Sequence, residues 1–142
     1  MTTEHIHNLV IGSGEAGKYL AWKLAKRGEK TAVVERSMVG GSCPNVACLP
    51  SKKVIYSAKA VSLVDPTVGL GVVTGTLHVD MAGVARRKRS MIDGLMELHH
   101  GYFKTSGAEL VMGEARFTEP KTVQVSRPNA QHGSPGRGQG RR

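Results

Sequence analysis

The stretch HNLVIGSGEAGKYLAWKLAKRGEKTAVVE, residues 7–35, decides the fold. It opens with a short apolar run, His7 to Ile11, which favours a buried strand. A helix is predicted over Lys18 to Arg27, because four apolar residues recur there at helical spacing and Gly28 follows as a stop signal. The four residues are Leu20, Ala21, Leu24 and Ala25. Thr31 to Glu35 reads as a second strand, so the order strand, helix, strand predicts an α/β fold with a parallel sheet.

Between the first strand and the helix lies GSGEAG, a GxGxxG pattern that closes a strand and opens a helix, as dinucleotide binding requires. Gly12 would permit the tight turn, Gly14 would let a pyrophosphate approach the backbone, and Gly17 would let helix and strand pack closely. Glu35 ends the second strand, where an acid accepts hydrogen bonds from the adenosine ribose and disfavours a 2′-phosphate. We therefore expect FAD or NAD here; the alternative is a purely structural turn with a solvated Glu35.

Further along, the chain predicts two more helices. Apolar residues at helical spacing indicate a helix over Ala47 to Ser62 and a longer one that opens after Asp80. The glycine- and threonine-rich residues 65–79 between them are predicted to be mostly loop, with a little strand.

The C-terminal part predicts strands and then a tail. ELVMGEARF, residues 109–117, and TVQV, residues 122–125, read as strands that flank a turn at Glu119 to Lys121, a small antiparallel segment. Residues 127–142 contain four glycines, two prolines and little that is apolar, so we expect disorder there and one folded domain over residues 1–126.

The formal charge of +9 raises the question of nucleic-acid binding. Four arginines lie in the tail and another basic block is Arg86 to Arg89, which reads as a solvated helix face. With 4% aromatic residues, a surface for stacking bases is poorly supported. No apolar run reaches the ~20 residues of a membrane span, and residues 1–8 lack a signal-peptide pattern, so we expect a cytoplasmic protein without a membrane anchor.

The segment GGSCPNVACLPSKK, residues 40–53, holds both cysteines of the chain, Cys43 and Cys48. Residues five apart in a regular helix rise ~7.5 Å, too far for a disulfide, so pairing requires a departure from helix, which Pro44 and Asn45 favour. Cys48 is then predicted near a helix N-terminus, which favours its thiolate form.

Three interpretations of the cysteines compete. A structural disulfide is disfavoured in a reducing cytoplasm, and so short a loop would stabilise little. A zinc site needs about two more ligands, and the adjacent His99 and His100 are expected to point apart on a helix. Redox-active cysteines remain the best interpretation, since a dinucleotide site just upstream could supply electrons.

The glycine turn with Glu35, followed by GGSCPNVACLPSK, resembles the N-terminal FAD domain of the class I pyridine nucleotide-disulfide oxidoreductases. This family includes glutathione reductase, dihydrolipoamide dehydrogenase and mercuric reductase. The resemblance runs from about His7 to Val125 and implies a Rossmann-like FAD-binding domain with a parallel sheet and helices on its faces. It also implies electron flow from NAD(P)H through FAD to a Cys43–Cys48 disulfide and on to a substrate.

By resemblance, Cys48 would face the flavin and Cys43 would be the interchange thiol that meets the substrate. Lys52 would lie near the flavin N5, and Ala115, in GEARF, would contact the adenine. The implied cofactor-binding residues are Gly12, Ser13, Gly14, Glu15, Ala16, Gly17, Glu35, Gly41, Ser42, Cys43, Lys52 and Ala115. A small disulfide or a metal ion would be the substrate, and no resident metal is expected.

The chain is shorter than the members it resembles. The resemblance implies a second glycine fingerprint for NAD(P)H, a late FAD strand and a dimerisation domain, and none is found in these 142 residues. We therefore expect an incomplete domain, a truncated or frameshifted product that is inactive alone, from a family whose full-length members are homodimers.

Two other functions stay open. One is a non-catalytic FAD- or nucleotide-binding module whose cysteines act only as a thiol sensor. The other is a basic interaction protein that uses Arg86 to Arg89 and the tail.

Overall fold

The computed structural model describes residues 3–63 and 75–126. The predicted disordered tail, residues 127–142, lies outside the described residues, as does most of the predicted loop. None of the described helices is long and apolar enough to cross a membrane.

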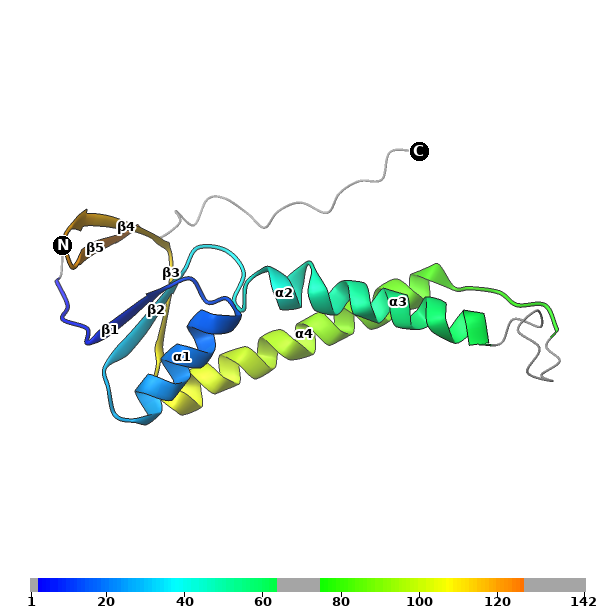
Figure 1. Ribbon diagram of the computed structural model, residues 1–142, viewed down its shortest axis with the longest axis horizontal. Coiled ribbons are helices and arrows are strands. Elements are labelled where there is room, and N and C mark those ends of the chain that lie inside the picture. Colours follow the sequence, from blue (N-terminus) through cyan, green and yellow to red (C-terminus); the bar gives the residue numbers. More distant parts are fainter. Residues whose placement is uncertain (1–2, 64–74, 127–142) are drawn as a thin grey trace.

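A three-stranded parallel sheet forms the centre of the molecule, as the sequence predicts (Figure 1). Its strands are β1 (Asn8–Ile11), β2 (Thr31–Glu35) and β3 (Glu109–Met112), in the order β1-β2-β3. Strand β2 lies in the middle and all five of its residues are buried, as expected of a strand with a neighbour on each side.

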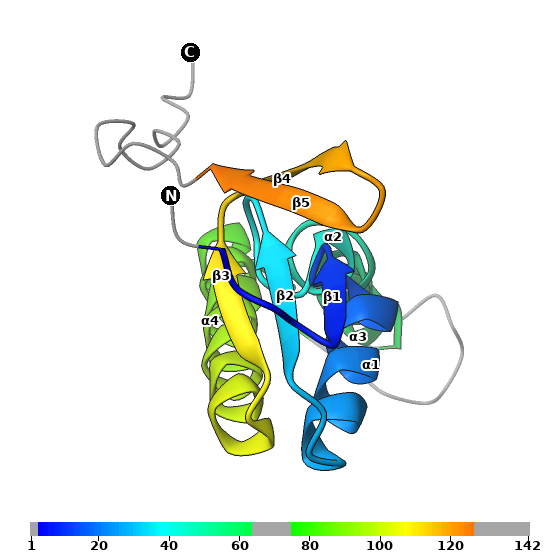
Figure 2. The ribbon, with the colours of Figure 1, turned by 90° about the vertical axis from the view of Figure 1, so that its left-hand side faces the viewer.

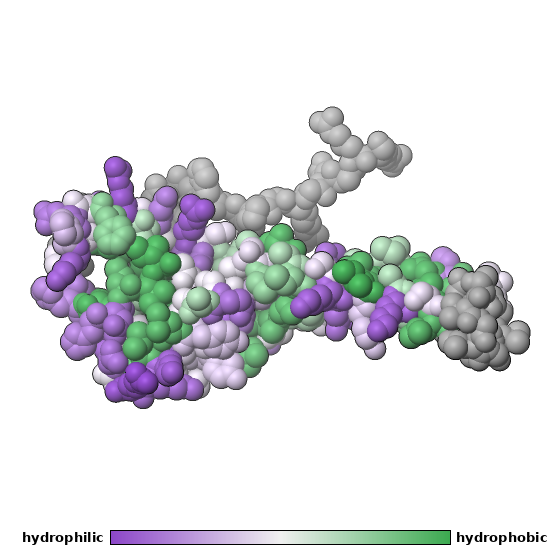
Figure 3. Space-filling view, in the orientation of Figure 1, coloured by the Kyte–Doolittle hydropathy of each residue, from purple (hydrophilic) through white to green (hydrophobic). Residues whose placement is uncertain are grey.

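The two faces of the sheet differ in how far other elements cover them. The register aligns Val10 with Val33 and Val33 with Leu110, and these residues pack on the core. Helix α1 (Glu15–Lys26) adds Ala21 and Trp22 to that core, and helix α4 (Met81–Ser106) adds Phe103. Side chains alternate along a strand, so β1 presents its other residues to the opposite face. There Leu9 and Ile11 are 39% and 49% exposed, and Figure 3 shows an apolar patch over the sheet.

Helix α1 differs from the prediction in its start and in its buried face. It begins at Glu15 and not at Lys18, directly after the glycine turn. Leu20, predicted on the apolar side, is 52% exposed, whereas Lys18 and Trp22 are buried. The prediction is correct for Ala21, which is buried, and wrong for Leu20, because helix α4 packs on the side of α1 that carries Trp22.

Two long helices form an arm that extends away from the sheet (Figure 1). Helix α3 (Cys48–Leu63) and helix α4 lie close to the bounds predicted for them. Arg87 joins the two, because its Nη2 donates to Ser57 Oγ at 3.1 Å and its guanidinium lies 5.6 Å from the centre of the Tyr56 ring. Part of the basic block at residues 86–89 therefore holds the arm together.

The segment predicted as one strand over residues 109–117 is divided in two. Strand β3 ends at Met112, and β4 (Glu114–Glu119) pairs antiparallel with β5 (Thr122–Ser126), which confirms the predicted turn between them. Gly113 makes the change of direction, and a side chain there would meet Val125 Cγ1 at 2.7 Å. Figure 2 shows the hairpin lying across the ends towards which the three parallel arrows point.

Candidate functional site

The glycine turn connects β1 to α1 at the carboxyl end of the sheet. Gly12 has a φ of 91°, a conformation that other residues adopt at a cost. A methyl group on Gly17 would overlap the carbonyl oxygen of Gly12 and lie 3.1 Å from Val10 Cγ1. The start of α1 is therefore held tightly against the end of β1, and its first backbone N–H groups face the space beyond the strands.

A buried hydrogen-bond network joins the glycine turn to the end of β2. Ser13 donates from both its N and its Oγ to Glu35 Oε2, at 2.9 and 2.7 Å, and Ser13 Oγ accepts from Gly40 N at 2.9 Å. Ser37 N donates to the other oxygen, Oε1, at 2.9 Å. Burial raises the pKa of Glu35, but these hydrogen bonds outweigh it and the pKa lies below its ordinary value. Glu35 is thus an ionised, acceptor-only carboxylate.

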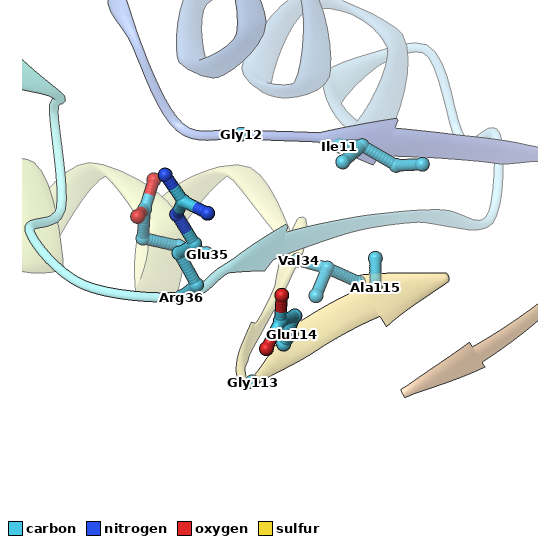
Figure 4. A pocket seen from close by; sticks show the side chains of 8 residues that line it. All are labelled: Ile11, Gly12, Val34, Glu35, Arg36, Gly113, Glu114 and Ala115. Atoms are coloured by element: carbon cyan, nitrogen blue, oxygen red, sulfur yellow. The ribbon is translucent and has the colours of Figure 1, made fainter. Parts of the chain in front are cut away.

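A cavity of about 240 Å³ lies beside this network, beyond the carboxyl ends of β1 and β2 (Figure 4). Ligands of open α/β sheets bind at this edge. Three residues singled out from the sequence, Gly12, Glu35 and Ala115, line the same cavity although Ala115 is far from the other two along the chain. The full lining is Ile11, Gly12, Val34, Glu35, Arg36, Gly113, Glu114 and Ala115.

Arg36 and Glu114 are cavity residues that the sequence analysis missed. Each stands next to a residue that it did single out, which is the signal that could have identified them. Arg36 places a positive charge at the end of β2, and Glu114 a negative one at the start of β4.

The cysteine segment begins against the glycine turn. A side chain on Gly41 would lie 3.0 Å from Gly14 Cα, so the two backbones touch. Helix α2 (Ser42–Asn45) follows at once, and the Asn45 side chain donates to Val39 O at 2.9 Å and to Gly41 O at 2.7 Å. The start of the cysteine segment is therefore tied back to the loop that follows β2.

The two thiols lie together at the break between α2 and α3. Cys43 is in the four-residue helix α2, and Cys48 is the first residue of α3, so the segment departs from regular helix as pairing requires. Both are free thiols. A hydrogen bond with Cys48, followed by burial, raises the pKa of the Cys43 thiol. Cys43 is half-buried and Cys48 is exposed, so both can react.

The remaining predicted residues flank this centre. Glu15 and Ala16 are exposed in the first turn of α1, and Ser42 is exposed at the start of α2. Lys52 is exposed on α3, one turn beyond Cys48. Within residues 3–63 and 75–126, no group of three or more histidine, cysteine or acidic side chains could hold a metal ion.

Two buried polar residues behind the cysteine segment were not predicted as part of the site. Lys18 is 1% exposed and pairs with Glu15, whose side chain is 46% exposed. His99 is buried, while His100 is exposed, so the two histidines do point apart. The His99 Nδ1 would lie 2.8 Å from a methyl on Gly40, and burial, followed by the charge of Lys18, lowers the His99 pKa.

Comparisons with known proteins match the chain to a family and to several similar proteins. The family model described as pyridine nucleotide-disulphide oxidoreductase matches residues 7–135. Over 122 residues the chain is 34% identical to the mercuric reductase of Staphylococcus aureus, covering 85% of this chain and 22% of that protein. Over 117 residues it is 33% identical to the dihydrolipoyl dehydrogenase of Geobacillus stearothermophilus, covering 82% of this chain and 25% of that protein.

A solved structure is also similar. It is the Cu(II) complex of the HOCl-induced flavoprotein disulfide reductase RclA from Escherichia coli, with a TM-score of 0.72 and 27% identity over 89% of this chain and 25% of that one. The chain thus spans about a quarter of the length of the relatives that it matches.

Proposed function

This chain belongs to the pyridine nucleotide-disulphide oxidoreductase family, and on that premise we propose that residues 1–126 are the FAD-binding part of a disulfide or metal-ion reductase. One observation carries the proposal. The same glycine turn touches both an open cavity lined by Glu35 and Ala115 and the backbone that leads into Cys43. A cofactor whose diphosphate rests on this turn would reach both the cavity and the cysteine segment.

The residues at the nucleotide end fit FAD. The first turn of α1 offers unpaired N–H groups to the diphosphate, and the ionised Glu35 can accept from ribose hydroxyls. A carboxylate at this position also repels the 2′-phosphate of NADP, which supports FAD as the occupant. Ala115 and the other lining residues would surround the adenine in the cavity.

The thiol pair would carry the reaction. The thiolate of Cys43 attacks one sulfur of a substrate disulfide, forming a mixed disulfide and releasing one substrate thiolate. The thiolate of Cys48 then attacks Cys43 Sγ, which forms the Cys43–Cys48 disulfide and releases the second substrate thiolate. Two electrons and two protons then reduce the Cys43–Cys48 disulfide and restore both thiols. FAD, when bound, supplies these electrons from NAD(P)H.

The substrate and the partners are proposed at the level of chemical class. A small disulfide or a soft metal ion suits a pair of thiols, and the similar proteins include a mercuric reductase and a flavoprotein solved as its Cu(II) complex. We place the NAD(P)H site and the dimer contacts of a cytoplasmic homodimer in the part of the relatives that these residues do not cover. The chain alone should therefore not turn over NAD(P)H.

The test is a titration of the purified chain with FAD, followed by reduction with a dithiol. We expect FAD to bind and its absorbance spectrum to change when the cysteine pair is reduced, and we expect Cys48→Ser to abolish the change. Binding with no change on reduction would favour a non-catalytic module or thiol sensor. If the folded chain does not bind FAD, the proposal is wrong. NAD(P)H turnover by the chain alone would contradict the expectation that the chain is inactive without the rest of the protein.

A further inference from the structure

Lys18 is unusual among the charged residues of this chain. Its side chain is 1% exposed, and lysine is almost never fully buried unless it is paired. Its Nζ pairs with Glu15 Oε1 and lies 5.3 Å from the centre of the Tyr19 ring. Because Glu15 is nearly half exposed, solvent screens its charge more than that of Lys18.

The backbone places this pair beside the cysteine segment. Gly41 touches Gly14, and those glycines directly precede the first residues of α2 and α1. Cys43 is thus one residue into α2, while Glu15 opens α1 and Lys18 lies one turn further along it. From the other side, His99 of α4 packs on Gly40, which also contacts Pro44. Lys18 is therefore a buried residue of α1 that lies about one helical turn from the place where the glycine turn contacts the cysteine segment.

We propose that Lys18 is a positioning residue that stabilises the thiolate of Cys43, and that Glu15 limits this effect by pairing with Lys18. The inference rests on the proposed function only in taking Cys43 as the thiol that attacks the substrate. The pair would adjust how readily that thiol reacts, without touching the substrate.

The charges that act on Cys43 agree with this role. A hydrogen bond with Cys48 raises the Cys43 pKa most, burial and the charge of Cys48 raise it further, the charge of Glu15 also raises it, and the charge of Lys18 lowers it. Among these influences the charge of Lys18 is the smallest, and it is the one that favours the Cys43 thiolate. Removing Lys18 should make the thiol less reactive, and removing the charge of Glu15 should make it more reactive.

The chain is well suited to a direct measurement because it has two cysteines. In the Cys48→Ser background, Cys43 is the single thiol, and its alkylation by iodoacetamide can be followed against pH. The Cys43 thiolate attacks the methylene carbon, a C–S bond forms, the C–I bond breaks and iodide leaves. The pH midpoint of the rate reports the thiol pKa without FAD or substrate.

In that background we expect Lys18→Met to move the midpoint to higher pH and to slow alkylation at pH 7 roughly three- to tenfold. Glu15→Gln should move the midpoint to lower pH and increase the rate, by a smaller factor because a thiolate of lower pKa is a weaker nucleophile. Lys18→Arg keeps the charge and should restore the midpoint. Lys23→Met, at an exposed position on the same helix, is the matched control and should change neither.

The outcomes separate a role in charge from a role in packing. If Lys18→Met and Lys18→Arg shift the midpoint alike, or if Glu15→Gln raises it, the proposal is wrong. Circular dichroism of each variant shows whether it folds, and Glu15→Gln, at a half-exposed position, still tests the proposal if the Lys18 variants do not. FAD titration of the same proteins tests the proposed function separately, so either conclusion can fail alone.

Discussion

The nucleotide end and the thiol end of the site are held in different ways. At the nucleotide end, Glu35 is 8% exposed and its two carboxylate oxygens accept hydrogen bonds from serines on either side. At the thiol end, Cys48 is exposed, Cys43 is half-buried, and the helix that carries Cys43 is four residues long. Hydrogen bonds to a buried carboxylate fix the first end, whereas the second is held by the hydrogen bonds of Asn45 to the backbone and by packing from behind.

This difference suits two kinds of work. A nucleotide is bound without changing its covalent structure, so a rigid, prearranged acceptor is an advantage there. A thiol pair must form and break a bond between its own sulfur atoms, and so requires some local freedom. Because both ends attach to the same glycine turn, damage to the turn should disable both, while damage to either end alone should spare the other.

Gly17→Ala should have the largest effect, because it attacks the shared turn. The added methyl group overlaps the Gly12 carbonyl, which belongs to the backbone and cannot rotate away. We expect a loss of roughly 3 kcal/mol in the free energy of unfolding and no FAD binding, measured by denaturant unfolding and flavin titration. Gly94→Ala, in a part of α4 with open space around it, is the control and should be neutral or slightly stabilising.

Gly40→Ala should damage the thiol end most, although Gly40 N also donates to Ser13 Oγ in the network at the nucleotide end. Its φ of 88° disfavours other residues, and the methyl group would lie 2.8 Å from His99 Nδ1. We expect a loss of roughly 2 kcal/mol of stability and an altered rate of Cys43 alkylation. Gly28→Ala has a similar φ of 85° but no atom within 4 Å, so it measures the backbone strain alone. Equal effects in the two variants would mean that the contact with His99 is unimportant.

Glu35→Gln should damage the nucleotide end selectively, costing about 1 to 2 kcal/mol because charged hydrogen bonds are lost. The folded-state pKa of Glu35 lies below its ordinary value of 4.5, so its ionisation stabilises the fold above that pH. This contribution disappears as the pH falls below about 4.5 and through the folded-state pKa. Unfolding curves across this pH range should show that the free energy of unfolding falls more steeply with acid in the parent chain than in the variant. The rate of Cys43 alkylation at pH 7 should be the same in the two proteins.

His99→Asn should have the smallest effect, and it tests how the buried ring that packs behind the thiol end contributes to stability. Because the His99 pKa is lowered in the fold, the neutral ring stabilises the folded chain, and this stability is lost as the pH falls below the ordinary value of 6.5. Burial lowers this pKa most, the charges of Lys18 and His100 lower it further, and the charge of Glu15 raises it. Thermal unfolding between pH 7.5 and 5.5 should show a weaker pH dependence in the variant than in the parent chain.

The sequence is sufficient to predict what local chemistry decides. Apolar β-branched residues mark β2 to the residue, and the glycine pattern marks the turn, because strand burial and tight turns leave direct traces in composition. Pro44 and Asn45 likewise indicate the break that lets Cys43 and Cys48 meet.

Other features depend on contacts between distant segments. The burial of Trp22 follows from the packing of α4 on α1, and nothing in the spacing of α1 alone predicts that Lys18 is buried as well. The division at Gly113 arises because the hairpin must turn away from the sheet, which a run of strand-forming residues does not reveal. The cavity is similarly a product of the fold, since its walls come from three strand ends.

The partly exposed side chains of the edge strand β1 have a practical consequence for anyone who handles the chain in isolation. Leu9 and Ile11 lie half in water on β1, which has a neighbour on one side in the sheet order β1-β2-β3. Apolar side chains next to unpaired backbone hydrogen-bonding groups of an edge strand favour self-association of the chain. Concentrated samples should therefore aggregate and become turbid on warming, and a mild detergent should reduce the turbidity.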